Sequence, residues 1–399
     1  MSSILTPVPA HAHELYARLG SFDDAIVDAV TRSEALDRFF ALSSGREKPG
    51  RFWRVDFEAL APEAGAIEPE TAEISVENRN PHAIACDLAT AARKYPQLLA
   101  RAFGTTGIAA SKFGALAQAF AGRGVFVYVP ADHACDEPIV ARYHAPAGTA
   151  IFPWSVVLAE RGSRVTFVER ITAGAGAFVC GATEIAGAEH SDVTCAVLQD
   201  VDRNARVIAS RAARPGRDAR IAWCLAELGG ALAAGDLRVS IEQPGATAHA
   251  TALFFPRGAQ HVDVISTMDH LAGEATSETL VKSAARERGQ ARFLGNIRIA
   301  PHAQGSDARL RDDALLLSPT AHVDSIPALE IGANDVKAYH GATVGAIDEE
   351  QIFYMESRGI PRGAAEEIIA LGYFEPAIER FPTAVLRDEI RASLAAKLA

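Results

Sequence analysis

The fold is decided by four short apolar runs that recur along the middle of the chain: VTFVE (165–169), VTCAVLQ (193–199), IAWCLAEL (221–228) and ATALFF (250–255). Their first residues lie about 28 positions apart, which predicts a structural repeat of the kind that solenoids show. Further strand-like runs lie between them: AFVC (177–180), ARVIAS (205–210) and LRVSIE (237–242). We therefore expect two strands in each repeat, with small residues at the turns.

This repeat favours a stacked β-solenoid over other β-rich folds. The strands are not separated by helical stretches of about 10–15 residues, which argues against a doubly wound βαβ sheet. A two-sheet sandwich gives a similar alternation of apolar and polar residues, so periodicity alone leaves both alternatives open.

The strand-rich part has helical neighbours on both sides. The run GVFVYVP (124–130) marks the change from helical to strand-like patterns, and short strands then continue to about residue 346. We expect a mainly helical region at 1–123, a β core at 124–346 and a helical C-terminal domain at 347–399.

Composition restricts the classes of function. The 399 residues are 49% hydrophobic and 22% charged, as in ordinary globular proteins, and the net charge of -11 argues against nucleic-acid binding. The longest weakly polar stretch, 104–130, is interrupted by Lys112 and Arg123, and the N-terminus carries no secretory signal pattern. An odd number of scattered cysteines fits reduced thiols: Cys86, Cys135, Cys180, Cys195 and Cys224. These features predict a cytoplasmic protein with no membrane segment.

Motifs of the common enzyme classes are missing from the sequence. It contains no GxxxxGK[ST], HExxH or GxSxG motif, so we expect neither an ATPase nor a hydrolase active site. It also contains no CxxC pair, so we do not expect a permanently bound iron–sulfur cluster. His133 and Cys135 would share one face of a strand and are a candidate pair for a soft metal. Two ligands are too few for a structural site, and the flanking acids with Pro138 indicate a loop.

The most informative segment is PALEIGANDVKAYHGATVGAIDEEQIFYMESRGI (327–360). It predicts a short strand at 328–331, a Gly-rich polar segment that carries His340, and then an amphipathic helix. Asp348 is placed to cap that helix, and Gly359 with Pro361 signals its end. A lone histidine in such a segment is either an ordinary surface group or a neutral imidazole ligand at an interface.

The same segment closely resembles the C-terminal signature of the SufB/SufD family of iron–sulfur cluster assembly proteins, and its SufD branch most. The matching parts are Val-Lys, the His-Gly-Ala-Thr-Val-Gly core, the acidic helix start and the Phe-Tyr to Ser-Arg-Gly-Ile ending. Similarity continues through 112–130, 261–299 and 312–331, and RFWRVDFEAL (51–60) resembles a tryptophan-containing segment near the start of SufD-type proteins.

Two departures from the family pattern concern thiols. The cysteine that many SufD sequences place two residues before the histidine is Ala338 here. SufB sequences carry a functional cysteine shortly upstream of the motif, where this chain has ALLLSPTAHVDSIP (314–327). No cysteine follows Cys224, so the resemblance implies that any thiolate at this interface comes from SufB.

The resemblance implies an α+β fold with a right-handed parallel β-helix core flanked by helical regions. It further implies a scaffold subunit, not itself a catalyst, that pairs with a SufB-like subunit, or with itself when isolated. His340 would then contribute to the place where clusters form, and a SufC-like ABC ATPase would dock on the C-terminal helices. The candidate docking residues are Ile352, Phe353, Tyr354, Arg358 and Ile368.

No tightly bound cofactor is expected from this resemblance. A transient iron–sulfur cluster would form at the interface with SufB, and whether the complex binds a flavin stays open. Two alternatives remain: a SufB-like scaffold that acts as a homodimer, and a β-helix enzyme that acts on polysaccharide. The second needs a groove with clustered carboxylates.

Overall fold

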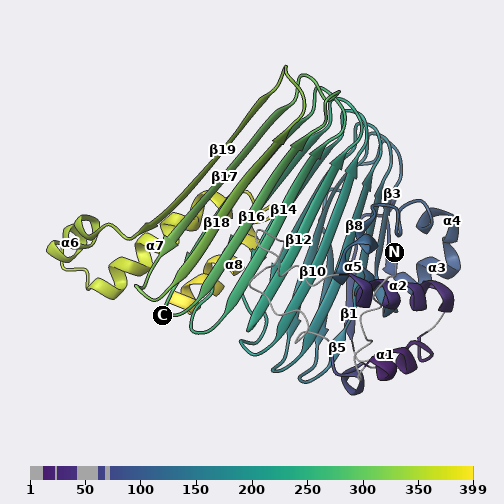
Figure 1. The fold of residues 1–399 in the computed structure, drawn as a ribbon, viewed down its shortest axis with the longest axis horizontal. Helices are drawn as coiled ribbons and strands as arrows, with labels where there is room; N and C mark the ends of the chain where they lie inside the picture. The colour runs from purple at the N-terminus through teal and green to yellow at the C-terminus, as the bar shows by residue number, and fades with distance from the viewer. Residues whose placement is uncertain (1–11, 23–24, 43–61, 68–71, 399) are drawn as a thin grey trace, which may run out of the picture.

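Two sheets wound as a β-solenoid form the centre of the computed structural model, which describes residues 12–22, 25–42, 62–67 and 72–398 (Figure 1). Successive strands of the core alternate between the sheets, and each pairs in parallel with the strand one coil further on. A β-sandwich would instead be built from antiparallel strands. The structure therefore confirms the predicted α+β fold with a β-helix core.

The two sheets, here called A and B, contain the following described strands. Sheet A consists of β2 (Ile84–Asp87), β3 (Arg123–Val129), β6 (Pro153–Ala159), β8 (Phe178–Gly187), β10 (Arg206–Pro215), β12 (Leu232–Ile241), β14 (His261–His270), β16 (Gln290–Ile299) and β18 (His322–Ile331), with β5 (Ala150–Ile151) beside β8. Sheet B consists of β1 (Glu73–Glu77), β4 (Ile139–Ala145), β7 (Arg164–Ala173), β9 (Asp192–Gln199), β11 (Arg220–Glu227), β13 (Thr247–Phe254), β15 (Thr276–Ala285), β17 (Asp307–Leu316) and β19 (Lys337–Ala346).

The register stacks similar positions of successive coils into columns. In sheet B, Phe167, Cys195, Trp223 and Ala250 are consecutive register partners and all belong to the buried interior. Because side chains alternate between the two faces of a strand, one such column fixes which residues point inward on every coil. The predicted repeat is thus the coil itself.

Turns at one edge of the solenoid are also stacked and hydrogen-bonded to each other. Each contains one residue with positive φ, and the backbone N–H of that residue donates to a carbonyl in the next turn. The series is Asp132, Gly162, His190, Asp218, Gly245, Glu274 and Gly305. This ladder satisfies backbone groups outside the strands and keeps the coils in register.

Helices before the core cover the outer face of sheet A at its N-terminal end (Figure 1). They are α1 (Ala12–Leu19), α2 (Ala29–Ala41), α3 (Leu88–Lys94), α4 (Pro96–Leu99) and α5 (Lys112–Ala119), with the 3-10 turns η2 (Ala64–Ala66) and η3 (Ile108–Ala110). Phe113 and Leu116 of α5 belong to one buried cluster with Trp154 and Phe178 of the sheet. The tryptophan-containing segment 51–60 lies outside the described residues.

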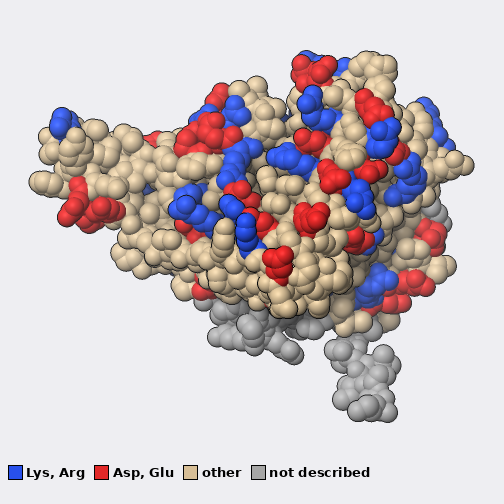
Figure 2. Space-filling view, turned by 90° about the horizontal axis from the view of Figure 1, so that it is seen from above, with Lys and Arg blue, Asp and Glu red and all other residues tan. Residues whose placement is uncertain are grey.

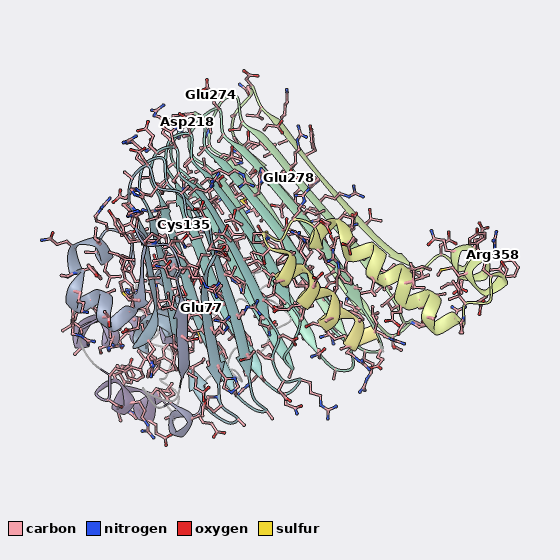
Figure 3. The ribbon with its side chains drawn as sticks, turned by 180° about the vertical axis from the view of Figure 1, so that it is seen from behind. Glu77, Cys135, Asp218, Glu274, Glu278 and Arg358 are labelled. Atoms are coloured by element: carbon pink, nitrogen blue, oxygen red, sulfur yellow. The ribbon has the colours of Figure 1, made fainter. Side chains whose placement is uncertain are left out.

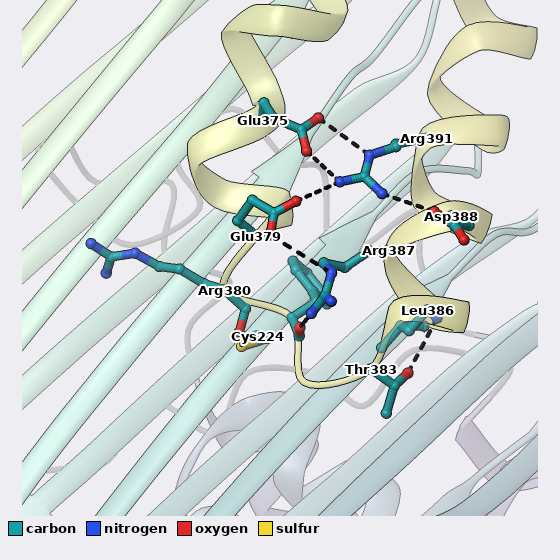
Figure 4. Close-up of polar contacts among 10 residues, drawn as sticks. Cys224, Glu375, Glu379, Arg380, Thr383, Leu386, Arg387, Asp388 and Arg391 are labelled. Carbon is teal, nitrogen blue, oxygen red and sulfur yellow. Dashed lines mark hydrogen bonds and ion pairs between the residues drawn. The ribbon is translucent and has the colours of Figure 1, made fainter.

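Three helices follow the core: α6 (Glu349–Ser357), α7 (Arg362–Ile378) and α8 (Ala384–Leu398). Helices α7 and α8 lie on the outer face of sheet B (Figure 3). Phe374 of α7 and Leu394 of α8 are buried in one cluster with Phe255 at the end of β13. Arg391 of α8 joins the two helices by ion pairs to Glu375 and Glu379 of α7 (Figure 4).

In contrast to α7 and α8, helix α6 projects beyond the last strands of the solenoid (Figure 1). The guanidinium of Arg362 in α7 makes two hydrogen bonds to the carboxylate of Glu349 in α6, of 2.7 and 2.8 Å. In the view of Figure 2 the projecting helix forms a lobe whose visible face is mainly neither acidic nor basic. The rest of that face carries both signs of charge interspersed.

Candidate functional site

The C-terminal end of the solenoid is open. Strand β18 is the last of sheet A and β19 the last of sheet B, so each has one edge with no described strand beside it. Side chains that one more coil would cover are left exposed here, among them Ile331, Tyr339 and Val344. Such an uncovered pair of edges is a template for pairing with another sheet.

His340 lies within β19, so the predicted Gly-rich polar segment is part of a strand. The predicted strand at 328–331 is likewise longer and forms the end of β18. His340 is the register partner of Leu310 in β17, which is buried in the solenoid interior. Partners in adjacent strands point to the same face, so the exposed His340 side chain is on the inner face of an uncovered coil.

A second polar group on this inner face did not emerge from the sequence. Asp312 of β17 is fully buried, and its carboxylate accepts a hydrogen bond from the Ser325 hydroxyl of β18. Burial raises the pKa of the Asp312 carboxyl to about 7. The neighbouring Asp313 is on the opposite, outer face and pairs with Lys282 and Arg311 at 2.8 and 2.9 Å.

The cysteines of the chain are not suited to act as thiolates. Burial raises the pKa of all five thiols above the usual range, and that of Cys224 to about 12. Cys180 and Cys224 donate to backbone carbonyls of Phe113 and Arg380, at the contacts of the sheets with the helices. Reactive cysteines combine a lowered pKa with exposure; Cys86 and Cys135 are half-buried and the other three are buried, and none has a lowered pKa.

The candidate docking residues on the C-terminal helices divide into two groups. Ile352 is only 1% exposed, which corrects its assignment as a surface contact. It is instead the buried anchor of α6. Phe353, Tyr354 and Ile368 are exposed, Phe353 by 73%. Arg358 is also exposed and lies over the Tyr354 ring, with its Cζ atom 5.1 Å from the centroid.

Local signals place α6 as expected from the sequence. The carboxylate of Asp348 accepts from the backbone N–H of Glu350 and caps the start of the helix. Gly359 has a φ of 84° and its N–H donates to Glu356, while the N–H of Ile360 donates to Met355. These two bonds form a Schellman motif, which ends the helix in the way the sequence predicts.

Among the residues that the structure describes, none joins His133 and Cys135 to complete a metal centre. The two side chains have different surroundings: the His133 ring lies 4.7 Å from the His82 ring, whereas Cys135 packs against the solenoid interior. Within the described ranges, no group of three or more His, Cys, Asp and Glu side chains is arranged to hold a metal ion.

A groove of about 740 Å³ lies on sheet B beside α8 and bears on the polysaccharide alternative. Two of its carboxylates are engaged in contacts across the groove: Glu389 with Arg170, and Asp200 with the Ser393 hydroxyl at 2.7 Å. Held by these contacts, Glu389 and Asp200 are not the free acid and base that glycoside hydrolysis needs, and Glu73 is the third carboxylate of the lining. In the described part of the chain, no helix is long and apolar enough to cross a membrane.

Comparisons with known proteins agree with the resemblance. The family model described as "SUF system FeS cluster assembly, SufBD core domain" matches residues 142–373, more than half of the chain. The iron–sulfur cluster assembly protein SufD of Bacillus subtilis is 26% identical over 329 residues, which cover 81% of this chain and 75% of that protein. SufD of Escherichia coli is 34% identical over 171 residues, 43% of this chain and 40% of that protein.

A SufBD family protein of Mycobacterium leprae is 28% identical over 261 residues, which span only 30% of its length. The matched core reaches from β4 into α7 and so includes the open end with His340. The chain therefore belongs to the SufB/SufD family of iron–sulfur cluster assembly proteins and is most like SufD.

Proposed function

We propose that this chain is a SufD-like scaffold subunit of a SUF-type iron–sulfur cluster assembly complex. The observation that carries the proposal is the open end of a family-typical solenoid with a histidine on its inner face. An imidazole at an uncovered sheet end is available to a second chain, whereas the same position one coil earlier is filled by buried Leu310.

Pairing with a SufB-like subunit would use the free edges of β18 and β19. Adding a strand to each edge supplies the missing backbone hydrogen bonds and covers exposed apolar side chains such as Val344. The edges have the same chemistry in any β-solenoid, so a second copy of this chain is the expected partner when a SufB-like subunit is absent.

His340 would supply a nitrogen ligand to iron, or to the growing cluster, at that interface. Neutral imidazole is a common ligand for iron, while clusters also need sulfur ligands. The pKa of every thiol of this chain is raised, which makes the cysteines poor donors, and Ala338 brings no sulfur to the site. The thiolate therefore has to come from the partner, and a cluster held there would be transient and shared.

A SufC-like ABC ATPase would dock on α6 and the first turns of α7. Phe353, Tyr354 and Ile368 present apolar surface there, and Arg358 adds a charge. Only Ile347 and Asp348 separate β19 from α6. Movement of a docked ATPase during nucleotide hydrolysis would thus act directly on the strand that carries His340, while the catalytic step belongs to the ATPase.

Co-expression of the tagged full chain with SufB-like and SufC-like subunits tests this function. We expect a complex of all three, seen by native mass spectrometry, that gains iron and sulfide on anaerobic reconstitution. His340→Ala should form the same complex with about tenfold less iron, or a greater loss. The matched control His13→Ala removes another exposed histidine, on α1 at the other end of the solenoid, and should behave as the wild type.

Two outcomes would contradict the proposal. If no ABC-type ATPase co-purifies with the tagged chain, the chain is not a scaffold subunit of such a complex. If the His340→Ala complex takes up as much iron as the wild type, His340 is an ordinary surface histidine.

A further inference from the structure

Asp312 is an unusual residue for its position inside the solenoid. It belongs to an inner column of sheet B whose three preceding members, Leu225, Ala252 and Val281, are apolar register partners on successive coils. The other buried carboxyl of this column, Glu169 at its N-terminal end, differs because Ser155 and Thr183 donate to its two oxygens. An apolar side chain would therefore satisfy the packing. A buried carboxylate costs several kcal/mol of desolvation, so its presence needs a reason other than packing.

The hydrogen bonding of Asp312 is also incomplete. Ser325 donates to Oδ2, while Oδ1 is buried and has no partner among the described residues. Asp313 on the outer face differs, since Lys282 and Arg311 both pair with it. A buried carboxylate oxygen left without a donor is a position that a cation can satisfy.

The register places this carboxylate close to His340. Asp312 pairs with Ala342, and Leu310 pairs with His340, so Asp312 and His340 are diagonal neighbours on the inner face. With strands about 4.8 Å apart and about 3.3 Å per residue, their Cβ atoms are about 8 Å apart. Two side chains that project to one face at this separation can share one ion. Ala342 adds only a methyl group between the carboxylate and the open end.

We propose that Asp312 and His340 together form a half-site for a divalent cation, ferrous iron in the assembly reaction, at the open end of the solenoid. The inference rests on the proposed function and adds a second ligand to it. Carboxylate oxygen and imidazole nitrogen are both ligands for ferrous iron. Ser325 acts as a positioning residue, because its hydroxyl orients the carboxylate.

Two ligands leave the coordination shell of the ion open. In a closed structural site all positions are filled by one protein, whereas here the remaining positions face the uncovered end of the coil. Sulfur ligands from a partner chain, or sulfide, can then complete the shell while the ion is still held. This arrangement suits a cation that has to be passed on.

The test is an anaerobic titration of the purified full chain with Co²⁺, followed by its visible absorption, and repeated with Fe²⁺. We expect Asp312→Asn and His340→Ala each to weaken binding about tenfold or more. The double variant removes both ligands of the ion and should bind no more tightly than either single variant. Asp307→Asn changes the same residue type at a half-buried, outward position of β17, where Asp307 pairs with Arg309, and should bind as the wild type.

Asp312→Val guards against a folding defect, because it restores the apolar character of the column; it should fold and bind weakly. If Asp312→Val or Asp312→Asn bound the cation as tightly as the wild type while His340→Ala lost binding, the role of Asp312 would be overturned. The role of His340 would remain. No binding by the wild-type chain would overturn the half-site. In either case the three-subunit complex, measured by co-purification, still decides the proposed function separately.

Discussion

Leu310 and His340 are register partners on the last two strands of sheet B, yet one is buried in the core and the other is exposed. The difference arises because β19 has no described strand on its far side. A position that is buried on every inner coil is therefore exposed on the last coil.

A lysine on the open end should block pairing of two solenoids. We expect Val344→Lys to leave the fold intact, because Val344 is exposed, and to reduce association with a SufB-like subunit or a second copy about tenfold or more. Analytical ultracentrifugation measures the association. Val385→Lys makes the same change at an exposed position of α8 and should have no effect. Equal association of both variants would place the interface elsewhere.

Two adjacent residues of α6 should respond differently to truncation. Phe353→Ala should keep its stability within about 0.5 kcal/mol, since the side chain is exposed, and weaken ATPase binding about tenfold. Ile352→Ala should loosen α6 itself, with a loss of about 2 kcal/mol or more, because the side chain is buried. Hydrogen exchange of α6 and a binding titration separate the two effects. ATPase binding that survives Phe353→Ala unchanged would contradict the docking role.

Two strand glycines should tolerate an added methyl group differently. A Cβ on Gly124 of β3 would lie 1.8 Å from the carbonyl oxygen of Trp154, so the strands must separate and Gly124→Ala should cost about 3 kcal/mol. A Cβ on Gly181 of β8 would lie 3.5 Å from Pro153, an ordinary contact, and Gly181→Ala should change stability by less than about 1 kcal/mol. Urea unfolding measures both. Similar losses in the two variants would show that the backbone contact is not the cause.

The coil repeat could be predicted from the sequence because inward residues recur at a nearly constant interval. Runs such as IAWCLAEL (221–228) are apolar on both faces, since the helices cover the outer face of sheet B. The start and end of α6 could also be predicted from the sequence, because Asp348 and Gly359 act through local backbone geometry. What could be predicted was therefore local or periodic.

The candidate site was harder to predict because its signals are not local. His340 is surrounded by small residues, which are typical of a loop, and only the pairing with β17 makes this segment a strand. Ile352 and Phe353 are both apolar neighbours, and only the packing of α6 on α7 decides which one is buried. Asp312 and Asp313 form an ordinary acidic pair until the register places them on opposite faces.

A buried histidine should make the stability of the fold depend on pH. His270 at the end of β14 is fully buried, and its Nε2 atom is 2.8 Å from the Ser277 hydroxyl. Burial lowers its pKa from 6.5 to about 4. Between these values the unfolded chain binds a proton that the folded chain does not. Stability is therefore fully present above pH 6.5 and is lost as the pH falls towards 4.

Replacing His270 with Gln keeps a polar group and removes the titration. From pH 7.5 to 5.0 the wild type should lose about 2 kcal/mol more unfolding free energy than His270→Gln does. Urea unfolding at the two pH values measures the difference, and the comparison cancels groups that titrate in both proteins. An identical pH dependence of the two proteins would mean that His270 accepts its proton in the folded state, through an opening of the coil that exposes its ring to water.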